Sequence, residues 1–279
     1  MNRDTPRLSP LARFGVAAAW GFSRLVRRRK FTVVAAVALG AGALFGWFVS
    51  RNQDPVAALL ELLDHGVLGT AVPLVALGLV AGGFGEEVSD RTLVYHLVRP
   101  VSRTTLFVAR YAAGAATGAL VGAAMAVVAH VASGTSMGVR VVASSALVAA
   151  AGVATVGALY YALAALFRRG IVAALVYTFV VELLFQNMPG TVQRLALTHH
   201  VRSLLHRLVD DDFAARSDAV VRAIADRGTP RFDPQAMRPI VEEPWTTLPS
   251  AALVCAAVVV VSLVVGARIV TRRDWALKE

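Results

Sequence analysis

Residues 85–110, GEEVSDRTLVYHLVRPVSRTTLFVAR, form a compact charged stretch between two long apolar runs of this 279-residue chain. The first run covers residues 67–84 and the second covers residues 111–132. Each run is close to the roughly 20 residues that an α-helix needs to cross a hydrocarbon core about 30 Å thick. The stretch therefore predicts a loop that joins two membrane-spanning helices on one side of a bilayer.

The composition of the whole chain predicts the same class of protein. Hydrophobic residues make up 57% of the chain and charged residues only 16%, and the apolar share exceeds the globular norm of about half. The apolar residues are gathered in long runs, which indicates an all-α membrane protein with six transmembrane helices. The predicted spans are residues 31–49, 67–84, 111–132, 141–167, 171–185 and 248–270.

Arginine and lysine residues beside the spans predict the orientation. The short loops on one side carry only Arg51 and Arg140, whereas clusters of basic residues flank the spans on the other side. Residues 186–250 hold eight arginines, but a loop of that length is translocated largely regardless of its charge. We therefore expect a multi-pass protein of the inner (plasma) membrane with both termini in the cytoplasm. The basic residues on the expected cytoplasmic side are Arg24, Arg27, Arg28, Arg29, Lys30, Arg91, Arg99, Arg103, Arg110, Arg168, Arg169, Arg268, Arg272, Arg273 and Lys278.

The net charge of +10 follows from this topology. Basic residues on the inner side are explained by membrane insertion and by attraction to anionic lipid headgroups. We therefore expect membrane lipids as partners and no nucleic acid. The single cysteine, Cys255, lies in the last predicted span and excludes an intramolecular disulfide.

The chain divides into four predicted regions. Residues 1–30 form a cytoplasmic N-terminus, in which apolar residues at Leu11, Phe14, Ala18, Phe22 and Val26 predict an amphipathic helix in the membrane interface. Residues 31–185 hold spans one to five and the charged segment 85–110. Residues 186–247 form an extracytoplasmic loop with helical apolar spacing, and residues 248–279 hold span six and a cytoplasmic tail.

The charged segment has a helical pattern of its own. Leu93, Val94, Leu97 and Val98 fall on one face of a short amphipathic helix. Pro100 ends this helix because it disfavours helical geometry at the preceding residue, and Ser102 is placed to cap the next helix. An ordinary solvated loop with a positive-inside bias remains the alternative.

The residues of this segment resemble those of a known family. Glu86-Glu87, Asp90-Arg91-Thr92-Leu93, Arg99-Pro100-Val101-Ser102-Arg103 and Arg110 before an apolar span are similar to the corresponding loop of ABC-2-type permeases, the membrane subunits of ATP-binding-cassette exporters. The chain departs from the family pattern at Asp90-Arg91, where members often have Arg-Gly, and at Ala109-Arg110, where Gly-Lys is common. The specific residues cover about a tenth of the chain, whereas the similarity in topology extends over all six spans and the interfacial helix.

The resemblance implies a coupling helix that docks on a separate ATPase subunit. It implies a pair of permease subunits, homodimeric or with a related chain, two ATPase copies that bind ATP and Mg, and export of a substrate that this sequence does not identify. The implied ATPase-coupling residues are Glu86, Glu87, Arg91, Leu93, Leu97, Arg99, Pro100 and Arg103.

The positions of the lysines indicate that this chain is not itself the ATPase. A P-loop needs a lysine after a glycine-rich turn, and the only lysines are Lys30 and Lys278. We therefore expect no enzymatic activity and no bound cofactor or metal in this chain.

Glycines at four-residue spacing predict close helix packing. Gly114, Gly118 and Gly122 repeat along the third predicted span, and pairs of glycines at this spacing occur in the first two. Packing inside the bundle and packing against a two-fold partner both fit the pattern. Pro73 in span two releases a backbone hydrogen bond and permits a kink.

Glu182 is the only carboxylate inside the predicted spans and is costly there unless it is paired. It is expected either to bond another helix or to line a substrate pathway. His130 is expected in the membrane interface. In the outer loop, His199, His200, His206 and Asp210-Asp211-Asp212 lack firm metal-ligand spacing, so we expect surface polarity there, on a helical cap that could gate an exit or receive an extracytoplasmic partner.

Two other functions are weighed against the permease. A secondary transporter or channel is the first, but the chain lacks internal repeats and has only one predicted intramembrane carboxylate, whereas coupling tends to use several. An intramembrane serine protease is the second, with Ser144, Ser145 and His130 as nearest candidates. No G-x-S-x-G turn surrounds those serines.

Overall fold

The computed structural model describes residues 9–82, 102–167, 169–186, 190–209, 212 and 246–272. Regular structure within these residues is helical throughout, with no strand among them. Five helical stretches are long and apolar enough to cross a membrane. The chain is therefore a multi-pass helical membrane protein.

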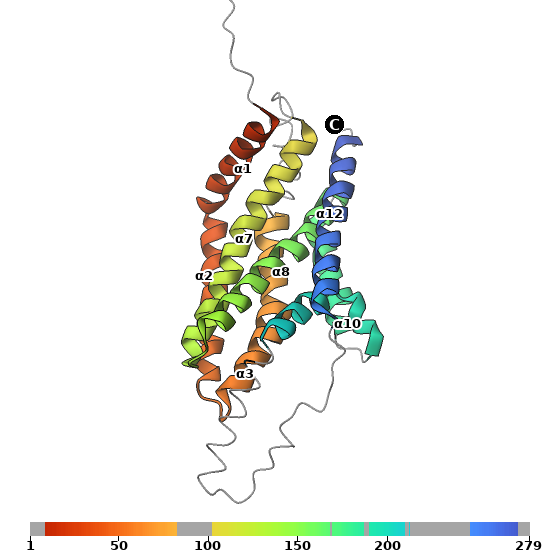
Figure 1. The fold of residues 1–279 in the computed structure, drawn as a ribbon. Helices are drawn as coiled ribbons and strands as arrows, with labels where there is room; N and C mark the ends of the chain where they lie inside the picture. Colours follow the sequence, from red (N-terminus) through yellow and green to blue (C-terminus); the bar gives the residue numbers. More distant parts are fainter. Residues whose placement is uncertain are drawn as a thin grey trace, which may run out of the picture.

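The first helices and the long central pair run between two ends of a bundle (Figure 1). We call these the α1 end, which also holds the start of α7 and the end of α12, and the α3 end. The helices before the charged segment are α1 (Pro10–Val26), α2 (Arg29–Val49), α3 (Pro55–Glu61), η1 (Leu62–Ala71), α4 (Val72–Val75) and η2 (Ala76–Ala81). Those after it are α7 (Arg103–Ser133), α8 (Val139–Leu166), α9 (Gly170–Tyr177), η3 (Thr178–Leu183), α10 (Leu184–Gln186), η4 (Gly190–Leu195), a helix over residues 197–209, and α12 (Leu248–Arg272).

Helix α7 lies at the centre of the bundle. It contacts α1 and α2 on one side, and η2, α8 and α12 on the others. Helix α1 packs beside the first turns of α7, and α2 packs farther along the same helix (Figure 1). The buried core is built largely from α7, α8 and the stretch from α3 to η2, with Phe107, Tyr160 and Tyr161 among its largest side chains.

The structure confirms the long apolar runs as helices, with extended limits for two of them. The predicted spans 31–49, 141–167 and 248–270 correspond to α2, α8 and α12, whereas α7 starts eight residues before predicted span 111–132 (111 − 103 = 8). The predicted span 171–185 corresponds to a shorter apolar helix, Gly170–Glu182. The helical run continues through η3 and α10 to Gln186, which at roughly 1.5 Å per residue gives about 25 Å. This is shorter than the hydrocarbon core of about 30 Å, so the sixth span stays a prediction.

The second span begins much earlier than its hydropathy suggests. Helix α3 starts at Pro55, and the Asp54 side chain caps it by accepting from the backbone N–H groups of Val56 and Ala57, both at 3.1 Å. The helical stretch then continues without a break to Ala81. Glu61, Asp64 and His65 do not end it.

Pro73 lies in the four-residue α4 between two π-helical runs, η1 and η2. Proline lacks the N–H that would continue the ladder, and wider turns are one way in which a buried helix satisfies the freed backbone groups. The backbone around the predicted kink position therefore departs from regular α-helix on both sides.

Candidate functional site

The segment predicted to contact an ATPase lies mostly outside the described residues. This holds for Glu86, Glu87, Arg91, Leu93, Leu97, Arg99 and Pro100. Arg103 is described: it is the first residue of α7 and is exposed at the α1 end. What the structure describes is therefore the helix that leads away from this segment and the contacts that hold it.

Helix α7 begins where the sequence predicts. Ser102 is the N-cap, and its hydroxyl oxygen accepts from the backbone N–H of Thr105 at 3.1 Å. From there α7 runs for 31 residues without interruption, a length of roughly 46 Å at about 1.5 Å per residue. This exceeds the hydrocarbon thickness of about 30 Å, so the helix spans the core and extends beyond it.

Helix α1 is attached to the first turns of α7. The guanidinium of Arg110 lies over the Trp20 ring, with 5.3 Å between its central carbon and the ring centroid. One turn away, a Cβ built on Gly21 would lie 3.1 Å from the Cβ of Ala113. The two helices therefore approach closely at this point.

The first turns of α7 are also bonded to α8, through aromatic side chains. The Tyr161 hydroxyl donates to the Phe107 carbonyl at 3.1 Å, and the Tyr111 hydroxyl donates to the Ala154 carbonyl at 2.9 Å. The rings of Phe107 and Tyr161 also pack against each other, with centroids 4.6 Å apart. These hydrogen bonds cross between helices in a buried region, where a lost partner is expensive.

The three predicted packing glycines of α7 lie inside the chain's own bundle. A Cβ on Gly114 would lie 3.2 Å from the backbone of Leu79 and Val80 in η2. Cβ atoms on Gly118 and Gly122 would lie 2.7 and 3.0 Å from the methyl groups of Val153 in α8. At distances this short a side chain would push its neighbours aside, so these glycines set the separation of α7 from η2 and α8.

Glycines of α2 make the same kind of approach to α7. A Cβ on Gly46 would lie 2.6 Å from the Ala129 carbonyl oxygen, and one on Gly42 would lie 2.9 Å from that of Met125. The sequence left two interpretations of these glycines open, packing inside the bundle or packing against a two-fold partner. The contacts described here are packing inside the bundle.

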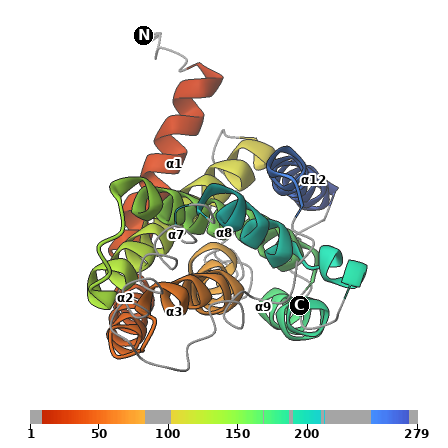
Figure 2. The ribbon, with the colours of Figure 1, turned by 60° about the horizontal axis from the view of Figure 1, so that its bottom comes forward.

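A second polar region lies toward the α3 end, where residues 197–209 form what we call the crossing helix. It runs over α8 (Figure 2). Val201 packs on Gly152, near the middle of α8, at a place where a Cβ would lie 2.9 Å from a Val201 methyl carbon. The part of the predicted outer loop that begins this helix therefore reaches into the bundle and is buried there from residue 196 to residue 203.

Glu182 caps the crossing helix. Its carboxylate accepts from the backbone N–H groups of Leu197 at 3.1 Å and Thr198 at 3.0 Å, and also from the hydroxyl groups of Thr198 and Tyr177. A negative charge at the first N–H groups of a helix is favourable because these groups lack partners in the helix and carry the positive end of its dipole. Glu182 is only 2% exposed, and these four donors supply its lone pairs with partners.

One turn farther along, the crossing helix is joined to η1 by a buried ion pair. Arg202 donates from Nε to Oδ1 of Asp64 at 2.7 Å, and its Nη2 donates to Oδ2 of the same carboxylate. Asp64 is 4% exposed and Arg202 is 3% exposed. The Nε2 atoms of His206 and His65 lie 3.3 and 3.6 Å from the Asp64 carboxylate.

Sequence reasoning missed this pair. The expectation that Glu182 is the only carboxylate within a span is wrong, because Asp64 lies inside the stretch Pro55–Ala81 and is buried. A signal did exist: Asp64 precedes Val67 and Leu68 by three and four residues, the spacing of one helix face, and both are buried. Arg202 likewise precedes the buried Leu205 by three residues and the buried Val209 by seven, which places all three on one face of the crossing helix.

Two of the histidines expected at the surface lie in other surroundings. His199 and His200 begin the crossing helix and are buried, so surface polarity is the wrong interpretation for them. His130 is also buried, and its Nδ1 lies 3.1 Å from the Ala126 carbonyl oxygen one turn earlier in α7. Asp210 and Asp211 lie outside the described residues, whereas Asp212 is 4.0 Å from Arg140.

The chemistry of this region is that of a joint between helices. In the described part of the chain, His, Cys, Asp and Glu side chains form no group of three or more suited to a metal ion. The Asp64 carboxylate accepts two hydrogen bonds from Arg202 of the crossing helix, and the Glu182 carboxylate accepts from the first residues of that helix. Both acids therefore hold that helix against the bundle.

Comparison with known proteins does not place the chain in a family. No protein-family model matches the sequence, and a search of curated proteins finds no significant relative.

Proposed function

We propose that this chain is the permease subunit of an ATP-binding-cassette exporter. It pairs with a second permease subunit and couples ATP hydrolysis by a separate ATPase, present in two copies, to export of a substrate. In this proposal the short apolar helix Gly170–Glu182 completes a set of six spans, and both termini lie in the cytoplasm of the cell, at the α1 end.

The observation that carries the proposal is the uninterrupted course of α7. It starts directly after the segment that resembles a coupling helix and runs for 31 residues to the α3 end. Its contacts to α1, α2, η2, α8 and α12 connect it to most of the bundle. A displacement applied to residues 85–102 would therefore move a rigid helix that contacts each of the other four long apolar helices.

The ATPase-docking role belongs to the segment before α7. Glu86, Glu87, Arg91 and Arg99 would fix its register on the ATPase, and Leu93 and Leu97 would supply an apolar face. Pro100 would separate this helix from α7, with exposed Arg103 at the joint. ATP and Mg would bind to the partner alone.

The crossing helix is proposed as the outer closure of the pathway. It lies on α8 near the middle of the span and is held by two buried carboxylates on different elements, Asp64 of η1 and Glu182 of η3. Movement of α7 and α8 would change the surface on which this helix rests. The crossing helix therefore suits a gate, or a site for an extracytoplasmic partner, more than a passive loop.

Co-purification with an ABC ATPase subunit from the same source tests the proposal. We expect the Leu93→Asp/Leu97→Asp double variant to lose the ATPase, and Glu87→Ala to lower its permease-stimulated turnover. Glu61→Ala provides a matched control, because Glu61 is an exposed glutamate in the α3 end of the fold. Each variant is first checked for a single symmetric elution peak in detergent. The proposal fails if no ATPase associates with the wild-type chain, or if the coupling variants behave like Glu61→Ala.

A further inference from the structure

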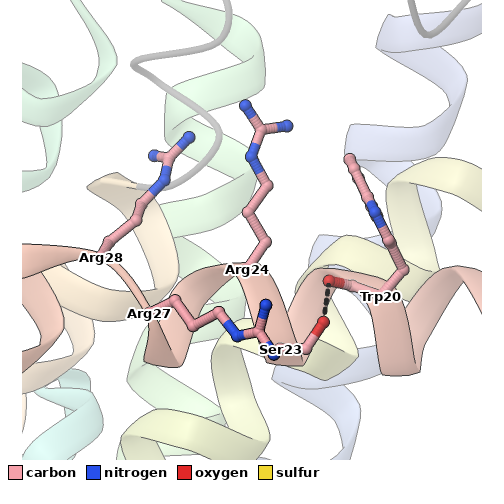
Figure 3. Close-up of a pocket in the computed structure, with 5 residues that line it drawn as sticks. All are labelled: Trp20, Ser23, Arg24, Arg27 and Arg28. Atoms are coloured by element: carbon pink, nitrogen blue, oxygen red, sulfur yellow. Dashed lines mark hydrogen bonds between the residues drawn. The ribbon is translucent and has the colours of Figure 1, made fainter.

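Basic side chains lie in two contrasting surroundings in this bundle. At the elbow between α1 and α2, three arginines that are at least partly exposed line a pocket (Figure 3): Arg24, Arg27 and Arg28. At the start of the crossing helix the basic side chains are buried instead, with His199 2% exposed and His200 9% exposed. Arginine stays charged in proteins, whereas histidine gains or loses its proton near neutral pH. The buried pair is therefore the group that can change its charge.

The two histidines are neighbours in space as well as in sequence. The ring centroids of His199 and His200 lie 5.5 Å apart, and both residues belong to the first turn of the crossing helix. The first turn carries the positive end of the helix dipole, which disfavours a cation there. Protonation of both rings would place two positive charges side by side at this end, so the seated helix favours the neutral pair.

The hydrogen bonds of His200 also suit a neutral ring. Its Nε2 lies 3.0 Å from the carbonyl oxygen of Arg194, and because a carbonyl only accepts, Nε2 carries the hydrogen. Its Nδ1 is buried, and none of the described residues hydrogen-bonds it. A proton on Nδ1 would add a buried N–H donor for which the described part of the chain supplies no acceptor, and such a donor is costly.

Positive charges on two elements act in the same direction. Burial, followed by the charges of His200, Arg202 and Arg194, lowers the pKa of His199 from 6.5 to about 4. Arg202 belongs to the crossing helix and Arg194 to η4. Burial also lowers the pKa of His200. The two rings therefore resist protonation for as long as the helix stays in place.

The two buried carboxylates oppose this effect without reversing it. Asp64 of η1 favours a proton on His199, and Glu182 of η3 favours one on His200. Both carboxylates already accept hydrogen bonds from other groups, and the loss of hydration on burial outweighs their attraction. Helix α8 contacts the crossing helix at Gly152, which brings no charge.

Two further histidines of this region face a different group. Nε2 of His65 and Nε2 of His206 lie 3.6 and 3.3 Å from the carboxylate of Asp64. A positive charge on either ring would therefore face a carboxylate of the joint to η1. The protons that would loosen the crossing helix are those on His199 and His200.

We propose that the crossing helix is a pH-sensitive switch, which stays on the bundle while His199 and His200 are neutral and detaches when mild acid protonates them. In the detached helix the His199 ring lies in water, and its pKa returns toward the ordinary value of 6.5. The detached form therefore binds more protons between about pH 6.5 and about pH 4, and a fall in pH through this window favours detachment. The proposal concerns the fold of this chain and does not rest on the export function.

Hydrogen exchange of the full chain in nanodiscs, at about pH 7.5 and about pH 5.0, tests the switch. Labelling times are scaled so that an unprotected amide exchanges equally at both pH values. We expect the wild type to lose about tenfold or more of its protection in residues 197–209 at the lower pH, as follows from one histidine with the two pKa values given above. Residues 111–132 of α7 serve as the internal reference and should keep their protection.

Variants at the two histidines remove the titrating groups. In His199→Gln/His200→Gln the ratio of protection between the two pH values should fall close to one. Each variant is compared with itself, so a general loss of stability does not imitate the result. The matched control is His65→Gln, which removes a histidine of the same region whose side chain is 56% exposed, and it should keep the wild-type ratio.

Four results would overturn the proposal. The first is equal protection of residues 197–209 at both pH values in the wild type. The second is a parallel loss in residues 111–132, which would indicate unfolding of the whole bundle. The third is a response of wild-type size in the double variant, and the fourth is an equal loss of response in the His65→Gln control. If the double variant yields no folded protein, His199→Gln and His200→Gln are measured singly, and each should reduce the response.

Discussion

Asp64 and Arg202 lie 138 residues apart in the sequence, yet their side chains form a two-point ion pair in the interior of the protein. The pair joins η1, in the second span, to the crossing helix that follows the fifth predicted span. Because both groups are nearly inaccessible to water, each charge depends on the other for its stability. The pair is therefore a specific joint between two distant parts of the chain.

Removing either charge should destabilise the protein far more than removing both. We expect Asp64→Leu or Arg202→Met alone to lower the free energy of unfolding by about 3–5 kcal/mol, because a buried charge is left without its partner. The double variant Asp64→Leu/Arg202→Met should recover most of this loss, since apolar replacements of a buried pair are often neutral or better.

Unfolding in detergent, followed by the loss of helical circular dichroism with denaturant, measures the effect. Arg140→Gln is the control: Arg140 is exposed and lies 4.0 Å from Asp212, so its loss should change stability by about 1 kcal/mol or less. Additive effects of the two single changes would show that the pair is not coupled.

Glu182 should act as a cap and not as a proton carrier. In Glu182→Gln one acceptor oxygen becomes an amide donor that faces the N–H groups of Leu197 and Thr198, so we expect a loss of about 1–2 kcal/mol. Hydrogen exchange should therefore speed up at the amides of Leu197 and Thr198. The control Glu61→Gln changes an exposed glutamate at the end of α3 and should leave these amides unchanged. Unchanged exchange in Glu182→Gln would contradict the capping role.

The parts of this fold that were predictable are those set by neighbouring residues. Ser102 begins α7 because a short hydroxyl side chain precedes a long apolar run, and α2, α8 and α12 follow from length and hydropathy alone. The joint between Asp64 and Arg202 depends on two segments far apart in the chain. A hydropathy window counts each charge as unfavourable and cannot register that the other charge offsets it.

The same reason explains the misplaced start of the second span. Glu61, Asp64 and His65 lower the local hydropathy, so the pattern predicts a start at residue 67, whereas the helix begins at Pro55. The crossing helix was predicted as helical but was placed in an outer cap. Its buried histidines and arginine acquire their surroundings only from α8, η1 and η3.

Gly118 should tolerate no larger side chain, whereas Ala116, two residues earlier in α7, should tolerate one. A Cβ on Gly118 would already lie 2.7 Å from a methyl carbon of Val153, so Gly118→Leu must push α7 away from α8. We expect a loss of about 3 kcal/mol or more, at or above the usual cost of overpacking a core. Ala116 is exposed on the same helix, and Ala116→Leu should have little effect on the unfolding midpoint. Equal midpoints for the two variants would contradict the close approach of α7 and α8.

If α7 carries the displacement from the ATPase side to the crossing helix, a break in α7 should leave ATPase docking intact and interrupt export. Ala116→Pro removes one backbone hydrogen bond and places a ring against the carbonyl of Ala112, which kinks a helix. Because Ala116 is exposed, the substitution disturbs the course of the helix with little direct disturbance of the core. The control is Ala116→Leu, which adds bulk at the same position and keeps the helix continuous.

The measurement reconstitutes each variant with its ATPase and compares three quantities: ATPase binding, ATP turnover, and protection of residues 197–209 from hydrogen exchange with and without ATP. In the wild type and in Ala116→Leu, we expect ATP to change the protection of the crossing helix. In Ala116→Pro, the ATPase should still bind and hydrolyse ATP, but the protection should no longer respond, because the connection between the two ends is interrupted. A response of wild-type size in Ala116→Pro would show that the displacement reaches the crossing helix by a route other than α7.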